Sequence, residues 1–221
     1  MKSGKNYIIL SKKERWGLTI WGWVLIVCFL FLMIFLGIRN LYGILAPNHR
    51  EDANILVVEG FISDYVLWDA MKEFRNNDYE LLITTGTPLE YGELLSPFKN
   101  TARIAGMSLL KLGFDSTKLV IVGTDSIRND RTYNSAIALR LWLKKNKPGI
   151  KAINLMTMSV HGARSQRLFQ YAFGDTIRVG IISVKNFYYG HRDWYKSSKG
   201  FRETLNEAIG YFYIRYFFRP Y

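Results

Sequence analysis

His161 heads the segment of this sequence that is best suited to chemistry. Arg164 and Arg167 follow it at i+3 and i+6, and on a helix this spacing keeps the three side chains within about 60° of one face. Histidine transfers protons near neutral pH, and arginines beside a helix N-terminus donate to oxyanions. The segment predicts an acid–base residue, His161, beside an anion-binding Arg164. An exposed basic helix with a capping histidine is the alternative.

A second candidate segment is Thr85-Gly86-Thr87. It offers backbone N–H groups, two hydroxyls and a glycine that permits close approach, features that suit a phosphate or another oxyanion. An ordinary turn after a strand is the alternative.

A third candidate segment, Asp130-Arg131-Thr132, stands where a helix is expected to begin. Asp130 is a plausible N-cap, and Arg131 would then point toward the same rim as the other polar segments. Gly60, after the first expected strand, completes the set of ligand-binding candidates.

Metal and cofactor motifs are missing from the sequence. His49, His161 and His191 are scattered, and the only cysteine is Cys28. The sequence contains no P-loop, no G-x-G-x-x-G and no G-x-S-x-G motif. We therefore expect neither a metal nor a bound cofactor.

The elements that must position these segments follow from alternating apolar and amphipathic runs. Strands are expected at Ala53–Val58, Leu81–Thr85, Lys118–Val122, Ala152–Met156 and Thr176–Ser183. Helices are expected after Ser63-Asp64 to about Asn76, and at Phe98–Leu112, Thr132–Asn146, Ala163–Phe173 and about Phe201–Phe218. This order predicts an α/β fold with a Rossmann-like, doubly wound, mainly parallel five-stranded sheet. Ligands of such sheets bind beyond the carboxyl ends of the strands, where the polar segments lie.

One transmembrane helix is expected before this domain. Gly17–Ile38 has 22 residues without a charge, which cover about 33 Å against a hydrocarbon core of about 30 Å. A cleaved signal peptide is the rival interpretation, but the apolar run is longer than is usual for one. We expect residues 1–16 to be a cytoplasmic basic segment, 39–52 a linker and 53–221 one domain.

Charge indicates the orientation and the partners. Five basic residues precede the span. The net charge is +12, of which the first 38 residues contribute +4 and the remainder +8. The positive-inside rule then predicts a single-pass plasma-membrane protein with a cytoplasmic N-terminus and an extracytoplasmic domain. Expected partners are membrane lipid, a lipid-linked or glycan phosphate and other envelope proteins, with no nucleic acid.

Two stretches near the C-terminus are rich in aromatic residues. Asn186–Lys199 is expected to be mobile. In the last helix, helical spacing relates Leu205, Ala208, Ile209, Phe212, Tyr213 and Tyr216, and we expect this face to cover the core. Contact with the bilayer interface is the alternative.

The sequence resembles the ElyC/SanA/YdcF family, whose shared domain is called DUF218. The resemblance rests on Ile55–Gly60, Thr84–Gly86, Asp130–Ala136 and His161–Ser165. It implies a Rossmann-like fold and a role in envelope maintenance. Family members often carry a Gly-Gly pair where this chain has Glu59-Gly60, and a glutamate and an asparagine where it has Asn134 and Ser135.

Three functions are compatible with these observations. The first is an envelope protein that acts on or binds an anionic or phosphorylated glycan or lipid-carrier intermediate, with His161 as the acid–base residue. The second is a non-catalytic, membrane-tethered scaffold for envelope enzymes. The third, a binder of a nucleotide-derived cofactor such as S-adenosylmethionine, requires a cytoplasmic domain.

Overall fold

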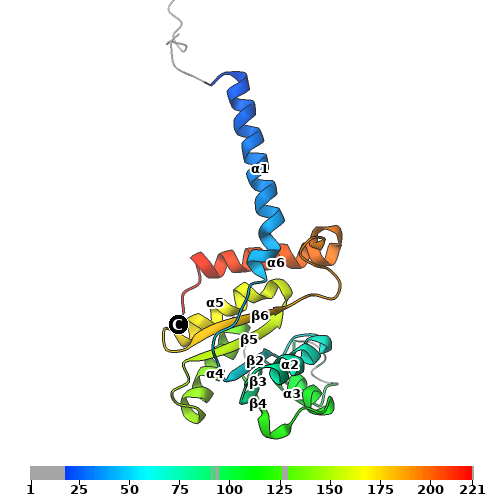
Figure 1. Cartoon of the computed structure of the whole chain (residues 1–221), viewed down its shortest axis with the longest axis vertical. Helices are drawn as coiled ribbons and strands as arrows, with labels where there is room; N and C mark the ends of the chain where they lie inside the picture. The colour runs from blue at the N-terminus through cyan, green and yellow to red at the C-terminus, as the bar shows by residue number, and fades with distance from the viewer. Residues whose placement is uncertain (1–17, 91, 93–94, 126–128, 221) are drawn as a thin grey trace, which may run out of the picture. The chain divides into compact units, whose positions relative to one another are not determined.

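The computed structural model describes residues 18–90, 92, 95–125 and 129–220. The chain separates into two compact units, Met1–Arg39 and Asn40–Tyr221. The basic segment expected at 1–16 lies outside the described residues. In the second unit, helices and strands alternate along the chain (Figure 1).

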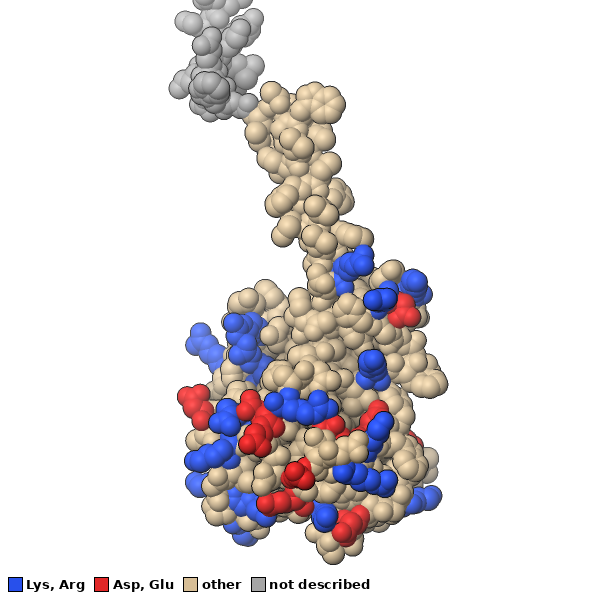
Figure 2. Space-filling view, in the orientation of Figure 1, with Lys and Arg blue, Asp and Glu red and all other residues tan. Residues whose placement is uncertain are grey.

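The first unit contains most of α1, the helix Ile20–Leu45. Its 26 residues have a mean hydropathy of 2.6 in the most apolar window, and none of that window is buried. At 1.5 Å per residue the helix is about 39 Å long, so it is long and apolar enough to cross a membrane. Figure 2 shows its surface free of charged side chains over most of its length.

The segment 39–52, expected to be a linker, is largely structured. α1 continues to Leu45, and the short strand β1 follows at Asn48–His49. β1 pairs antiparallel with β6. The helix extends beyond the uncharged run because a single arginine, Arg39, does not end a helix, and the chain turns only near Pro47.

A doubly wound sheet forms the centre of the second unit, and this prediction is confirmed. Its order is β1-β6-β5-β2-β3-β4, and all pairs except β1–β6 are parallel. The expected count of five strands is wrong, because the sheet also contains β1. A two-residue edge strand leaves no pattern in the sequence. The five others are β2 (Ile55–Glu59), β3 (Leu81–Gly86), β4 (Leu119–Gly123), β5 (Ala152–Met158) and β6 (Arg178–Val184).

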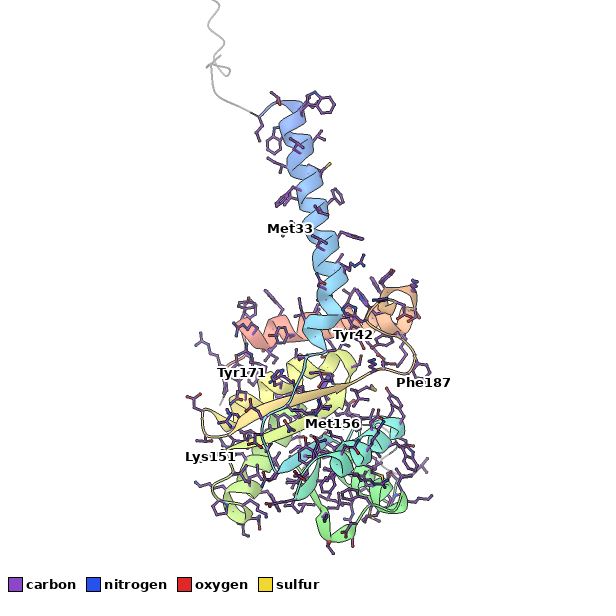
Figure 3. All side chains as sticks on the ribbon, in the orientation of Figure 1. Met33, Tyr42, Lys151, Met156, Tyr171 and Phe187 are labelled. Carbon is purple, nitrogen blue, oxygen red and sulfur yellow. The ribbon has the colours of Figure 1, made fainter. Side chains whose placement is uncertain are left out.

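Helices cover both faces of this sheet. Side chains of β2 alternate: Ile55 and Val57 pack in a cluster with α4 and α5, while Leu56 and Val58 pack in a cluster with α2 and α3. This alternation is what a strand between two helical layers requires. The four helices are α2 (Asp64–Asn76), α3 (Thr101–Lys111), α4 (Arg131–Asn146) and α5 (Gly162–Phe173). Met156 of β5, labelled in Figure 3, lies at the centre of the domain and is almost fully buried.

A third cluster joins the end of α1 to the C-terminal region. Tyr42 and Leu45 pack with Val160, Tyr189 and Trp194, and Tyr42 is marked in Figure 3 beside α6. The aromatic stretch expected to be mobile therefore supplies two buried anchors, Tyr189 and Trp194. Their packing partners are distant in sequence, so the local pattern of residues could not indicate that this stretch is anchored.

The last helix, α6 (Ser198–Tyr216), runs along α5. The prediction that its aromatic face covers the core is wrong, because Ile209, Phe212, Tyr213 and Tyr216 are exposed. Only Ile214 of this helix joins the cluster formed with α4 and α5.

Two glycines allow α3 to lie close to the ends of the strands. A Cβ on Gly60 would lie 2.5 Å from the carbonyl oxygen of Thr101, and a Cβ on Gly86 would lie 2.5 Å from the backbone nitrogen of Ala102. Both distances are far inside van der Waals contact. The close approach that these glycines permit is therefore taken up by the first turn of α3 rather than by a ligand.

Candidate functional site

A cavity of about 820 Å³ lies where the strand order reverses. β2 continues on one side to β3 and β4, and on the other side lies next to β5 and β6, so the switch point falls between β2 and β5. Doubly wound sheets bind ligands at this position. The cavity is lined by Glu59, Phe61, Thr85, Gly86, Thr87, Thr101, Asn129, Asp130, Arg131, Thr132, Ser135, His161, Arg164, Leu168, Tyr213 and Ile214. Of the residues in the predicted candidate segments, all except Gly60 and Arg167 therefore line one cavity.

His161 follows a backbone turn that only a few residue types adopt easily. β5 ends at Met158, and Ser159 then takes a φ of 52°. The Ser159 hydroxyl and the Tyr42 hydroxyl are 3.0 Å apart and both are buried. Left-handed backbone in a residue other than glycine is uncommon and is frequent at functional sites. Here it directs the short 3-10 turn Ser159–His161 toward the cavity.

The His161 ring is held by Glu207 of α6. Nδ1 lies 2.9 Å from Glu207 Oε1. Arg164 donates from Nε to Glu207 Oε2 at 2.7 Å and from Nη2 to Oε1 at 3.0 Å. An ionised carboxylate only accepts hydrogen bonds, so the proton of the neutral imidazole resides on Nδ1. Arg164 Nη2 is also 3.0 Å from His161 Nδ1, because both nitrogens donate to the same oxygen, Glu207 Oε1.

The opposite ring nitrogen, Nε2, is consequently the unprotonated one. It is buried and has no hydrogen-bond partner among the described residues. Its ring stands edge-on to Phe61, with centroids 4.8 Å apart. His161 lines the cavity, and a ring that is held in one orientation, with the lone pair of its second nitrogen not engaged by the described residues, is the arrangement expected of a general base.

Glu59 places a second carboxylate beside this histidine. It ends β2, is 2% exposed and accepts a hydrogen bond of 2.7 Å from Ser165 Oγ. Its Oε2 lies 4.0 Å from His161 Nε2. Buried carboxylates are rare unless paired. Glu59 would stabilise the imidazolium that forms once Nε2 has taken a proton.

Electrostatics keep Glu207 ionised. Burial would raise the pKa of Glu207, but the hydrogen bonds from His161 and Arg164 outweigh it and lower this pKa to about 2. Burial likewise disfavours the charge on Arg164, whose pKa is nevertheless raised by its pairing with Glu207. The cluster is therefore a fixed ion pair with a histidine attached.

Thr85 contributes a buried hydroxyl to the cavity. The side chain is 1% exposed, and Oγ1 has no hydrogen-bond partner within the described part of the chain. A buried hydroxyl without a partner costs about 1–3 kcal/mol. Since Thr85 lines the cavity, a bound ligand would supply the missing partner.

The N-terminus of α4 also faces the cavity. Asp130 occupies the N-cap position with a φ of 51°, and its side chain makes no capping hydrogen bond. The first amides of a helix have no partner within the helix and carry partial positive charge. Asp130, Arg131 and Thr132 all line the cavity, so this helix end can donate to an anion.

The two predicted anion-binding arginines are already occupied. Arg131 donates from Nε to Thr87 Oγ1 and from Nη2 to the Pro88 carbonyl, both at 2.7 Å, and it forms an ion pair with Glu90. Arg164 is paired with Glu207. Their role in the structure is to fix the loop after β3 and the His161 ring.

Arg167, expected on the same face as His161, lies elsewhere. It lines a separate groove with Ile44, Pro47 and Tyr211 and stacks on Tyr171, 5.7 Å from the ring centroid. The three-residue spacing of the segment moves each successive side chain about 60° around the helix, and two such steps are enough to leave the cavity.

Sequence reasoning missed Glu59, Ser165 and Glu207. A signal for Glu59 was present, because a charged residue closed an otherwise apolar strand. Glu207 gave no local signal, since it lies 46 residues from His161. Among the described residues, no group of three His, Cys, Asp or Glu is placed to hold a metal ion.

No family model, no curated protein sequence and no solved structure matches the chain. The fold and the site define its class by themselves: an α/β protein with a Rossmann-like doubly wound sheet and a polar cavity at the switch point.

Replacing Glu207 by Gln should destabilise the protein in a pH-dependent way. Its folded pKa of about 2 lies below the ordinary 4.5, so its stabilisation is complete above pH 4.5 and disappears as the pH falls toward 2. We expect a loss of about 2–3 kcal/mol at neutral pH, measured by urea unfolding of the full chain. Glu90→Gln, at an exposed ion pair, is the matched control and should change little. If the loss of unfolding free energy in Glu207→Gln did not change with pH, the lowered pKa of Glu207 would be contradicted.

Proposed function

We propose that this chain is a membrane-anchored cell-envelope protein that binds a phosphorylated glycan or lipid-carrier intermediate and transfers a proton through His161. The observation that carries the proposal is the buried Nε2 atom, which has no partner among the described residues and belongs to a ring held by Glu207. The resemblance to the ElyC/SanA/YdcF family supports the envelope role.

Proton transfer follows from the geometry around His161. Neutral His161 carries its proton on Nδ1, so Nε2 would accept a proton from a substrate hydroxyl. The resulting imidazolium lies between Glu207, 2.9 Å from Nδ1, and Glu59, 4.0 Å from Nε2. The same proton can then pass to a leaving oxygen, so that the histidine returns to its starting state.

The anionic part of the substrate would occupy the opposite side of the cavity. Thr85 Oγ1 and the first amides of α4 provide donors there, while the nearby guanidinium groups are engaged by carboxylates. The volume of about 820 Å³ lies within the range of pockets that bind small ligands. A sugar phosphate is of suitable size and offers both a hydroxyl and an anion.

We place the protein in the plasma membrane, with the N-terminus in the cytoplasm and the domain outside. The basic residues before α1 support this orientation. A reporter fused after Tyr221 tests it, and cytoplasmic activity of the reporter would instead favour a nucleotide-derived cofactor as the ligand.

His161→Gln should abolish function without affecting the fold. Glutamine cannot accept and release a proton, and general acid–base catalysis contributes about 10²–10⁴-fold in rate. The measurement is rescue of envelope integrity in a strain that lacks the chain, with protein level checked by immunoblot. His49→Gln, at an exposed histidine, should rescue normally. Full rescue by His161→Gln would contradict proton transfer and favour a non-catalytic scaffold.

Thr85→Val should weaken anion binding while leaving stability unchanged or slightly improved. Valine keeps the shape of the side chain and removes one donor, and one hydrogen bond of about 0.5–1.5 kcal/mol corresponds to about a 2- to 12-fold loss in affinity. Binding of inorganic phosphate to the full chain is measured through the NMR signals of His161.

Thr157→Val is the matched control for this experiment. Thr157 is also buried, and its hydroxyl has no hydrogen-bond partner among the described residues, but it is not among the residues that line the cavity. Equal losses of phosphate affinity in the two variants, or none in Thr85→Val, would overturn the role of Thr85.

A further inference from the structure

The inner side of α6 carries both polar and apolar residues, and its outer side is apolar. Its buried positions are Gly200, Thr204 and Ile214, and Glu207 contacts the His161 ring. An ordinary surface helix keeps its large apolar residues toward the core and its polar residues outside. The inner side of α6 is explained by the site that it helps to build. The outer side requires a different explanation.

The outer side carries an apolar stripe, with Arg202 within its first turn. Taken at 100° per residue, its members fall within about a third of the helix circumference. Ile209, Phe212 and Tyr216 are 69%, 57% and 68% exposed. We call this stripe the outer face of α6, and it consists of Phe201, Leu205, Ile209, Phe212, Tyr213 and Tyr216. Contiguous exposed apolar surface of this kind marks an interaction site.

Basic side chains accompany the outer face. The chain from residue 185 to its end has seven Lys or Arg and three Asp or Glu. Glu207 is engaged by Arg164, and Glu203 by Lys199. Arg202 and Arg215, on the same helix, are exposed. Aromatic residues combined with flanking cations are typical of helices that lie in the interface of a membrane.

The position of α6 is tied to the end of α1. Tyr42 and Leu45 belong to a buried cluster in which Leu41 and Ala46 pack together with Ala208 and Tyr211 of α6. These residues of α1 follow directly on the apolar run expected to span the bilayer. Residues of α6 therefore pack against a part of the chain that lies only a few residues from the point at which α1 would leave the membrane.

From these observations we infer that the outer face of α6 lies in the membrane–water interface, with Arg202 and Arg215 contacting anionic lipid headgroups. The inference rests on the proposed membrane anchoring and is independent of the chemistry at His161. Because Tyr213 and Ile214 also line the cavity, the interfacial helix would form one wall of the site, so that a lipid-linked substrate can enter while its tail stays in the bilayer.

Depth-dependent fluorescence quenching tests this inference on the full chain. The protein is placed, one copy per disc, in nanodiscs of phosphatidylcholine and phosphatidylglycerol, with or without brominated acyl chains. Cys28, the only cysteine, carries an environment-sensitive dye and reports insertion of α1. In a Cys28→Ala background, Ile209→Cys carries the same dye on the outer face of α6. Lys111→Cys, at the exposed end of α3, is the matched control.

We expect brominated lipid to quench the dyes at positions 28 and 209 but not at 111. Adding Phe212→Asp and Tyr216→Asp should abolish quenching at 209, and because both side chains are exposed the fold should be unaffected. Quenching at 28 without quenching at 209 would overturn the inference and leave the anchoring intact. No quenching at 28 would overturn the anchoring as well. A blue shift at 209 only when two copies share a disc would identify a second copy as the occupant.

Discussion

The carboxylate of Glu207 makes the interaction on which the geometry of the site depends. It receives hydrogen bonds from His161 and from two nitrogens of Arg164, so it fixes the tautomer of the ring and neutralises the nearest cation. It also ties α6 to the turn after β5, and α6 in turn supplies part of the cavity wall. Without this carboxylate, the largely buried Arg164 would lose its ion pair, and an unpaired charge in such a position destabilises the fold.

The sheet imposes a second constraint on the same site. Glu59 ends β2 and His161 follows β5, and these strands are neighbours at the switch point, so the two side chains lie close together although they are far apart in the sequence. Gly60 and Gly86 let α3 close over the strand ends. The two non-glycine residues with left-handed backbone in the described chain, Asp130 and Ser159, both stand at this rim. Backbone of this kind persists where the surrounding structure holds it in place.

The fold was largely predictable because its signals are local. Apolar runs gave five of the strands, and amphipathic stretches gave the helices, with errors of a few residues at the ends. β1 was missed because two residues have no periodicity. The burial of Tyr189 and Trp194 and the exposure of Phe212 depend on which elements become neighbours, and one helix pattern fits a buried face as well as an exposed one.

The site was predictable in position but not in pairing. The rule that ligands bind at strand ends predicted that His161, Thr85 and Arg131 lie together, and they line one cavity. Sequence spacing could not reveal that Arg131 pairs with Glu90 and Arg164 with Glu207, because these contacts are set by tertiary packing. Because these pairings engage both arginines, the histidine, whose ring is held by Glu207, is the stronger candidate for chemistry at this site.

The tautomer of His161 tests the central claim most directly. It can be measured by nitrogen NMR of the full chain labelled with ¹⁵N-histidine, with Glu207→Gln for comparison. The account predicts a proton on Nδ1 and a lone pair on Nε2, with this preference weakened in Glu207→Gln. A proton on Nε2 of the neutral ring, or a preference that Glu207→Gln leaves unchanged, would contradict it.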